Sequence, residues 1–203
     1  MSTTADKILA EIARHEEDWC FSPKDFMGLA ERGALDKAFS RLTSEGVIRR
    51  IGRGVYDVPR YSKVLKRVLS PNPNQIARAV ARRFGWRILP TGAYAANMLN
   101  LSTQVPMKIV YQSDGPTKMM NFESWTLHFK HTAPKKLAAS EMSGLLINAL
   151  QFLGKEHVTP EMLAKLKRRF TDEQKEQLLE DARYGPDWIH VIIRSICLGS
   201  ADS

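Results

Sequence analysis

Hydrophobic residues between positions 33 and 58 recur first at the spacing of a helix and then at the spacing of strands. The helical stripe consists of Leu35, Ala38, Phe39 and Leu42. Gly46 stands where a glycine commonly ends a helix. Apolar and polar residues then alternate on both sides of a turn that carries Arg53 at its tip. The pattern predicts a helix over residues 33–44 followed by a short β-hairpin.

Two shorter helices are predicted before this segment. Ile8, Leu9 and Ile12 form the apolar side of the first helix. Residues 22–25 read Ser-Pro-Lys-Asp, which is an N-cap, a proline at the first helical position and an acidic third residue. They open a second helix that we expect to continue through Leu29. Three helices followed by a hairpin is the order of a winged helix, whose last helix reads the DNA major groove.

A linker with two prolines follows, because Ser70–Asn74 cannot form regular structure. Asn72 is placed to cap a further helix that Gly85 ends. Beyond this helix, strands are predicted near residues 87–89, 108–111 and 125–130, with a helix over residues 91–99. Further helices are predicted at about residues 138–153, 160–169, 172–183 and 187–197.

The predicted fold class is therefore α+β. An N-terminal winged helix-turn-helix domain is expected at residues 1–68. A mixed α/β domain is expected at residues 69–203, and its helical C-terminal part spans about residues 138–203. We find no internal repeat and no low-complexity segment.

Positive charge is concentrated in the middle of this chain of 203 residues, whose net charge is +8. Residues 32–70 hold ten Lys and Arg against three Asp and Glu, and residues 71–136 hold nine against two. Both flanking segments are net acidic. Clustered cations release condensed counterions from a polyphosphate, so the distribution favours a nucleic acid as partner. An anionic membrane is disfavoured because no basic amphipathic helix with bulky aromatics accompanies the charge.

The candidate DNA contacts lie on the polar side of the helix over residues 33–44 and on the hairpin. Lys37 and Arg41 are one turn apart, so both can reach into one groove. Arg53 at the hairpin tip can enter a minor groove. The expected DNA-binding residues are Lys37, Ser40, Arg41, Arg49, Arg50 and Arg53. Candidates for additional phosphate contacts are Arg32, Lys63, Lys66 and Arg67.

Neighbouring residues on a strand point to opposite faces, and this separates Arg49 from Arg50. At most one of the two is expected to reach phosphate. The other is expected to pair with Glu45 or Asp57.

The sequence indicates no enzyme, no cofactor and no metal site. The phosphate-binding patterns GxxxxGK[ST] and GxGxxG are both absent. His128 and His131 would point to opposite faces of a predicted strand, which suits a metal poorly. Cys20 and Cys197 lack metal-ligand spacing and are expected to be reduced, partly buried thiols. Because the chain has no apolar run of about 18 residues and no signal-peptide pattern, we expect a cytoplasmic protein.

Two segments together resemble the AbiEi-like antitoxins of type IV, or AbiE-type, toxin–antitoxin systems. They are GVIRRIGRGVYDVP at residues 46–59 and PTGAYAANMLNLSTQVPMKIVYQSDGP at residues 90–116, of which the second is more specific. The resemblance covers about residues 5–135. It implies a transcriptional autorepressor that binds inverted repeats in its own promoter through a winged helix. By matching positions, DNA reading falls on the helix over residues 33–44 and on Arg49, Arg50 and Arg53.

The same resemblance implies an antitoxin of an abortive-infection system, which neutralises a nucleotidyltransferase toxin without forming a stable complex. The alternative is a protein-interaction adaptor that controls a toxin through its C-terminal domain, with DNA binding secondary. An RNA-binding module would favour exposed aromatic residues for base stacking, and residues 32–83 offer few.

Overall fold

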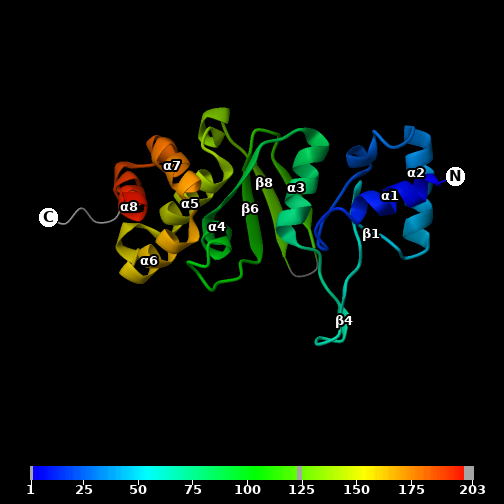
Figure 1. Ribbon diagram of the computed structural model, residues 1–203, viewed down its shortest axis with the longest axis horizontal. Helices are drawn as coiled ribbons and strands as arrows, with labels where there is room; N and C mark the ends of the chain where they lie inside the picture. Colours follow the sequence, from blue (N-terminus) through cyan, green and yellow to red (C-terminus); the bar gives the residue numbers. More distant parts are fainter. Residues whose placement is uncertain (1, 123–124, 199–203) are drawn as a thin grey trace. The chain divides into compact units, whose positions relative to one another are not determined.

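The computed structural model describes residues 2–122 and 125–198, and the chain divides into two compact units, Met1–Trp86 and Arg87–Ser203. Both helices and strands occur in each unit (Figure 1). The expected α+β class is thereby confirmed. The sequence placed a domain boundary between residues 68 and 69, whereas the first compact unit continues to Trp86.

The first unit begins with three helical elements, continues with two small hairpins and ends with a helix. Its elements are α1 (Thr4–Ile12), the 3₁₀ turn η1 (Pro23–Phe26), α2 (Arg32–Ser44), β1 (Arg49–Gly52), β2 (Val55–Asp57), β3 (Tyr61–Ser62), β4 (Arg67–Val68) and α3 (Pro73–Phe84). The cap of α3 is as predicted, because the Asn72 side chain accepts a hydrogen bond from the backbone of Asn74. Gly85 ends that helix in the left-handed conformation, with φ of 72°.

The core of the first unit is rich in aromatic rings. Phe26 and Phe39 pack edge to face with ring centroids 5.5 Å apart, and Phe39 also meets Tyr56 at 4.9 Å. The apolar stripe predicted for α2 is buried in full, since Leu35, Ala38, Phe39 and Leu42 are all among the core residues. Burial of one side of α2 leaves its other side free of the core.

The second predicted helix is a single 3₁₀ turn. Its start is as expected, because Ser22 and Asp25 form a capping box. The turn stops at Phe26, two residues before Gly28, and the expected continuation through Leu29 is wrong. Glycine costs about 1 kcal/mol in a helix interior relative to alanine, which removes much of the reason to propagate so short a helix.

The β1–β2 hairpin places Arg53 and Gly54 at its tip. Arg49 pairs with Asp57 and Gly52 with Val55, with an irregularity in the register between them. Gly54 has a φ of +71°, a conformation that favours glycine. A second hairpin, β3–β4, follows directly and forms a narrow projection marked by β4 in Figure 1.

The second unit combines a four-stranded sheet with a helical layer. Its elements are β5 (Ile88–Thr91), α4 (Gly92–Met98), β6 (Lys108–Ser113), β7 (Lys118–Asn121), β8 (Thr126–His131), the 3₁₀ turn η2 (Pro134–Leu137), α5 (Glu141–Leu153), the 3₁₀ turn η3 (Lys155–His157), α6 (Pro160–Arg169), α7 (Asp172–Asp181), the 3₁₀ turn η4 (Ala182–Tyr184) and α8 (Asp187–Leu198). The strand order is β5-β6-β8-β7, with β6 and β8 parallel and the other pairs antiparallel.

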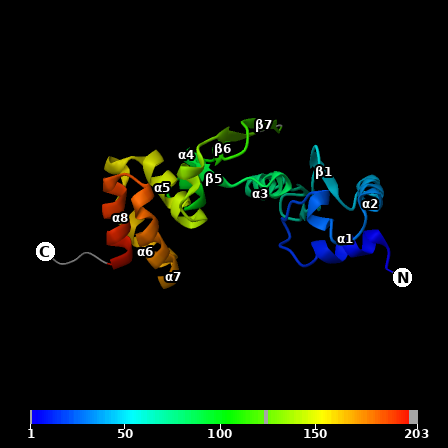
Figure 2. The ribbon, with the colours of Figure 1, turned by 90° about the horizontal axis from the view of Figure 1, so that it is seen from above.

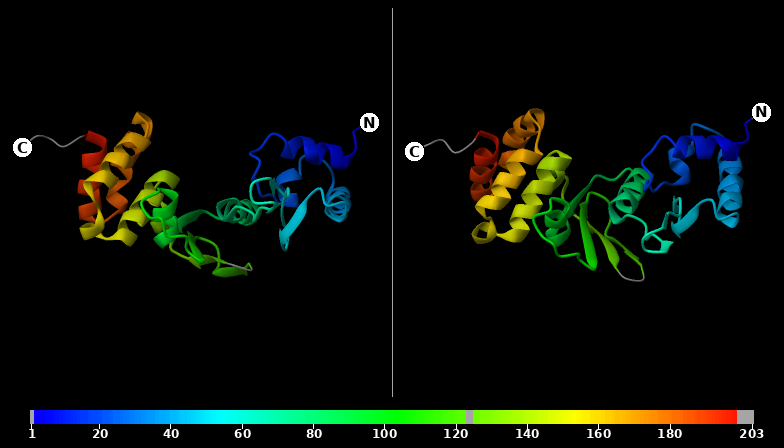
Figure 3. Two further views of the ribbon diagram at one scale, coloured as in Figure 1. Left: turned by 90° about the horizontal axis from the view of Figure 1, so that it is seen from below. Right: turned by 60° about the horizontal axis from the view of Figure 1, so that its bottom comes forward.

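Helices α5 to α8 lie side by side in Figures 2 and 3 and share one apolar core with α4. The four C-terminal helices are confirmed, although α5 begins at Glu141 rather than near residue 138. Helix α5 is apolar nearly all round and eight consecutive residues, 143–150, are buried. A Cβ at Gly144 would lie 2.5 Å from the Leu89 side chain, so the glycine permits α5 to approach β5 closely.

Candidate nucleic-acid interface

The exposed side of α2 carries three of the predicted DNA contacts. Lys37, Ser40 and Arg41 are all exposed, as the helical spacing predicted. Arg41 lies 3.7 Å from Glu45 in an exposed ion pair, which costs little to break. Within the described residues, Lys37 and Ser40 have no polar partner. These side chains are therefore free to meet an external ligand.

Two adjoining hollows separate α2 from the β1–β2 hairpin. One, of about 440 Å³, is lined by Ser40 and Ser44 of α2 and by Arg50 of the hairpin. The other, of about 290 Å³, is lined by the cationic side chains Lys24, Arg32, Arg50 and Arg83. Asp36 is the acidic residue in both linings and forms an exposed ion pair with Arg32. The hollows together form a groove with an excess of positive charge, which we call the α2–hairpin groove.

Arg50 and Arg49 have different roles, as their alternation along β1 predicted. Arg50 is exposed and lines both hollows of the α2–hairpin groove. Arg49 instead donates to Asp57, with Nε–Oδ1 at 3.0 Å and Nη2–Oδ2 at 2.6 Å. Its remaining donors reach the carbonyl oxygen of Leu69 at 3.2 and 3.3 Å. The pairing of Arg49 with Asp57 is one of the two pairings that the sequence allowed, and it occupies this guanidinium inside the protein.

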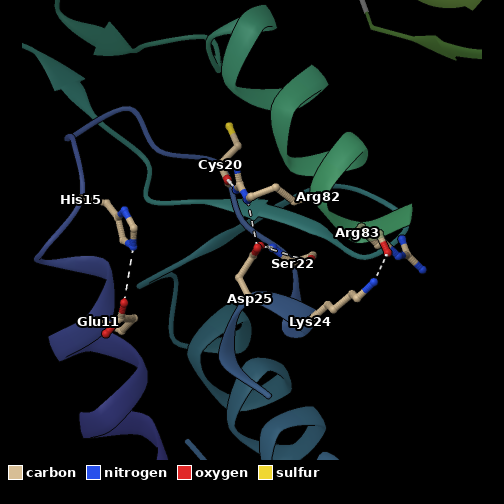
Figure 4. A network of polar contacts seen from close by, with 8 residues as sticks. All are labelled: Glu11, His15, Cys20, Ser22, Lys24, Asp25, Arg82 and Arg83. Atoms are coloured by element: carbon tan, nitrogen blue, oxygen red, sulfur yellow. Dashed lines mark hydrogen bonds and ion pairs between the residues drawn. The ribbon is translucent and has the colours of Figure 1, made fainter. Parts of the chain in front are cut away.

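The tip of the β1–β2 hairpin is held from α3. The guanidinium of Arg83 donates to the backbone carbonyl of Arg53 and lies where a Cβ of residue 54 would be. The φ of +71° favours glycine at position 54, and a Cβ there would displace the Arg83 guanidinium. The Arg53 side chain is exposed, as predicted. Lys24 donates to the backbone carbonyl oxygen of Arg83 at 3.1 Å (Figure 4). Arg83 therefore connects Lys24 of η1 with the tip of the β1–β2 hairpin.

Arg82, next to Arg83, connects α3 to the N-terminal elements. Its Nε lies 2.9 Å from Oδ1 of Asp25, and its Nη2 donates to the carbonyl oxygen of Cys20 at 2.7 Å (Figure 4). The same guanidinium lies over the Trp19 ring, 5.6 Å from its centroid. Burial, followed by the charges of Asp57 and Asp18, raises the pKa of the Cys20 thiol to about 12. This network is a structural support for the groove.

The additional phosphate contacts expected at Lys63, Lys66 and Arg67 lie on the β3–β4 hairpin, where all three side chains are exposed. Lys66 adopts the left-handed conformation, with φ of 50°. The sequence missed this hairpin because its loop contains no glycine, proline or asparagine. Lys24 and Arg83 were also missed, since they reach the groove from elements far apart in the sequence.

The second unit brings together fewer charged groups. His128 and His131 lie on β8, and the pKa of His128 is lowered by burial and then by Lys108. Asp181 accepts a hydrogen bond from the Ser140 backbone at 2.9 Å. Among residues 2–122 and 125–198, no group of three or more His, Cys, Asp and Glu side chains could hold a metal ion. No described helix is long and apolar enough to cross a membrane.

The chain belongs to a family of unknown function, DUF6088, whose model matches residues 7–178. No curated protein matches the chain. Among solved structures, it is similar to the RV2827C protein from Mycobacterium tuberculosis, with 13% identity and a TM-score of 0.41. That similarity covers 98% of this chain and 78% of the other.

Proposed function

We propose that this protein is a DNA-binding transcriptional autorepressor and the antitoxin of a type IV toxin–antitoxin system. The observation that carries the DNA-binding part is the exposed side of α2, with Lys37, Ser40 and Arg41, beside the positively charged α2–hairpin groove. The proposal adds no chemistry, because repression needs only occupancy and bending of an operator. The expected partner is double-stranded DNA with inverted repeats in the protein's own promoter.

In this proposal the first unit acts as a winged helix-turn-helix. Helix α2 enters the major groove, where Lys37 and Arg41 meet guanine edges and Ser40 meets a base or a phosphate. Arg53 at the tip of the β1–β2 hairpin contacts the flanking backbone or minor groove. Arg50 and Arg83, which line the α2–hairpin groove, contact phosphates that lie between α2 and the hairpin tip. Arg49 is left out, since Asp57 already holds its guanidinium.

The antitoxin part of the proposal rests on the resemblance of residues 46–59 and 90–116 to the AbiEi-like antitoxins. In it, the second unit counteracts a nucleotidyltransferase toxin without a stable complex. The antitoxic role and the DNA-binding role are separate, so each needs its own test.

Fluorescence anisotropy tests the DNA-binding part. The purified chain is titrated into the duplex upstream of its own gene and into a scrambled duplex, each over a salt series. Tight, selective binding to the upstream duplex is expected, with affinity that falls steeply as salt rises. Equal and weak binding to both duplexes would contradict the proposal. Arg194→Ala on α8 removes one exposed positive charge outside the first unit, and this variant should bind the upstream duplex as the wild-type chain does.

Co-expression tests the antitoxin part. A nucleotidyltransferase encoded next to this gene is expressed with and without the protein, and growth is measured. Restored growth without co-elution on gel filtration supports the proposal. Restored growth with a stable co-eluting complex would favour the adaptor, in which the second unit binds the toxin directly.

A further inference from the structure

The β3–β4 hairpin exposes an unusual set of side chains for its size. Two of its apolar residues form the tip, where Val64 is 90% exposed and Leu65 is 55% exposed. Tyr61 and Val68 are also exposed on the strands. Single exposed apolar residues are common on proteins, but several together on one projection indicate a contact surface.

Positive charge surrounds this apolar tip. Lys63 and Lys66 flank Val64 and Leu65 directly, and Arg67 follows. No Asp or Glu occurs anywhere from residue 58 to residue 113. The partner that complements such a hairpin carries negative charge outside and a place for apolar groups inside.

Hydrogen bonds join the two strands of the hairpin at its root and shape its tip. Leu69 donates its backbone N–H to the carbonyl oxygen of Arg60 at 2.7 Å, which closes the root. The backbone of Leu65 donates to Oγ of Ser62 at 3.1 Å, which shapes the tip. Arg49 ties the Leu69 carbonyl to Asp57, so the roots of the two hairpins meet at one ion pair.

We propose that the β3–β4 hairpin is a second DNA-contacting arm, whose Val64 and Leu65 side chains wedge between base pairs in the minor groove. Proteins that bind this groove combine Lys and Arg on the phosphates with apolar side chains that partly unstack a base step. The hairpin presents both groups within four residues, and its root is fixed to the β1–β2 hairpin of the proposed winged helix. This inference rests on the proposed function and specifies where and how a bend in the operator arises.

The test uses the full chain and the upstream duplex with 2-aminopurine placed at successive base positions. Unstacking raises the fluorescence of 2-aminopurine, so we expect a rise at one base step when the wild-type chain binds. Val64→Ser with Leu65→Ser should abolish that rise and weaken binding about tenfold. Val191→Ser, which alters a 67% exposed residue of α8, is the matched control and should change neither.

The cations of the arm have a separate readout. Lys63→Ala with Lys66→Ala should reduce the salt slope of log K by about two, which corresponds to two lost phosphate contacts. The fluorescence rise should persist in this variant at saturating protein.

Selective binding of the wild-type chain without any rise in fluorescence, and with unchanged affinity after Val64→Ser and Leu65→Ser, would overturn the wedge alone. Absence of selective binding would overturn the proposed function and the wedge together. Binding to phosphatidylglycerol vesicles that depends on the same two side chains, without unstacking of DNA, would also overturn the wedge. A dimer in sedimentation equilibrium that these substitutions dissociate, again without unstacking, would do the same.

Discussion

Arg49 and Asp57 face each other across the β1–β2 hairpin, and two hydrogen bonds join the guanidinium to the carboxylate. Asp57 is only 5% exposed, so its carboxylate is largely shielded from water and is paired with Arg49 instead. The same guanidinium reaches the carbonyl oxygen of Leu69, where the second hairpin ends. One side chain therefore sets the positions of two neighbouring hairpins.

Arg49→Met is expected to destabilise the first unit by about 2–3 kcal/mol, because it leaves the Asp57 carboxylate buried and unpaired. The midpoint of urea unfolding, followed by circular dichroism, measures the effect. Arg50→Met on the same strand is the control, since Arg50 is exposed and should alter stability by less than about 0.5 kcal/mol. Equal midpoints for the two variants would contradict a structural role for Arg49.

In a DNA-binding assay, by contrast, the direct effect is expected from Arg50→Met and not from Arg49→Met. Arg50 lines the α2–hairpin groove, so Arg50→Met should lower affinity for DNA and flatten its salt dependence in a fully folded protein. Anisotropy titrations at two salt concentrations give the comparison. Unchanged affinity of this variant would remove the groove from the interface.

Lys37→Ala combined with Arg41→Ala should abolish the preference for the upstream duplex while the fold remains intact. Both side chains are exposed, and the ion pair of Arg41 with Glu45, at 3.7 Å, is exposed as well, so stability should change little. Competition between specific and scrambled duplexes measures selectivity. Retained selectivity with unchanged circular dichroism would contradict the role of α2 in base reading.

Arg53→Ala should weaken DNA binding and reduce the salt slope by about one, as expected for a single phosphate contact. Arg83 remains beside the altered tip, because it bonds the backbone of residue 53 and not its side chain. The hairpin should therefore keep its conformation. A slope equal to that of the wild-type chain would show that the tip does not touch DNA.

The two cysteines should differ in reactivity toward a thiol reagent at pH 8. Cys20 is fully buried and its pKa is raised to about 12, so its thiolate is scarce as well as inaccessible. Burial also raises the pKa of Cys197, but that residue is half-buried on α8. We expect Cys197→Ser to remove the reaction of the folded protein. A fast reaction that persists in this variant would mean that Cys20 is accessible.

Asp181→Asn should destabilise the second unit at neutral pH by about 1–2 kcal/mol. Burial raises the pKa of Asp181, but hydrogen bonds led by that from Ser140 outweigh it and lower the pKa below the ordinary 3.8. A depressed folded-state pKa stabilises the protein above the unfolded value, and this contribution is lost as pH falls through the folded value. The difference between variant and wild type, from urea unfolding midpoints, should therefore shrink below about pH 4. A constant difference from pH 7 to pH 3 would contradict this.

Local periodicity made α2 and the β1–β2 hairpin predictable. The apolar spacing fixed the buried side of α2, and hence the exposure of Lys37, Ser40 and Arg41. Alternation along β1 separated Arg49 from Arg50. These features depend on residues close together in the chain, where spacing and geometry are directly linked.

Features that depend on distant contacts were not predictable. The parallel pairing of β6 with β8 joins strands that β7 separates in the sequence. The groove includes Arg83, which lies 59 residues from the Lys24 that binds its carbonyl oxygen. The β3–β4 hairpin has two residues in each strand and a lysine in the left-handed conformation, so neither alternation nor turn composition revealed it.

Because helix α3 supports the elements that precede it, the segment that can be exchanged between related proteins as one module has to include this helix. Without it, Asp25 would lose its arginine partner, the Cys20 carbonyl would lose its donor, and the hairpin tip would lose the guanidinium that holds it. A recombination point before Pro73 would therefore transfer the groove without these three contacts. A point after Trp86 transfers the groove together with its supports, so a hybrid protein that takes the groove from one parent should inherit everything up to that residue from it.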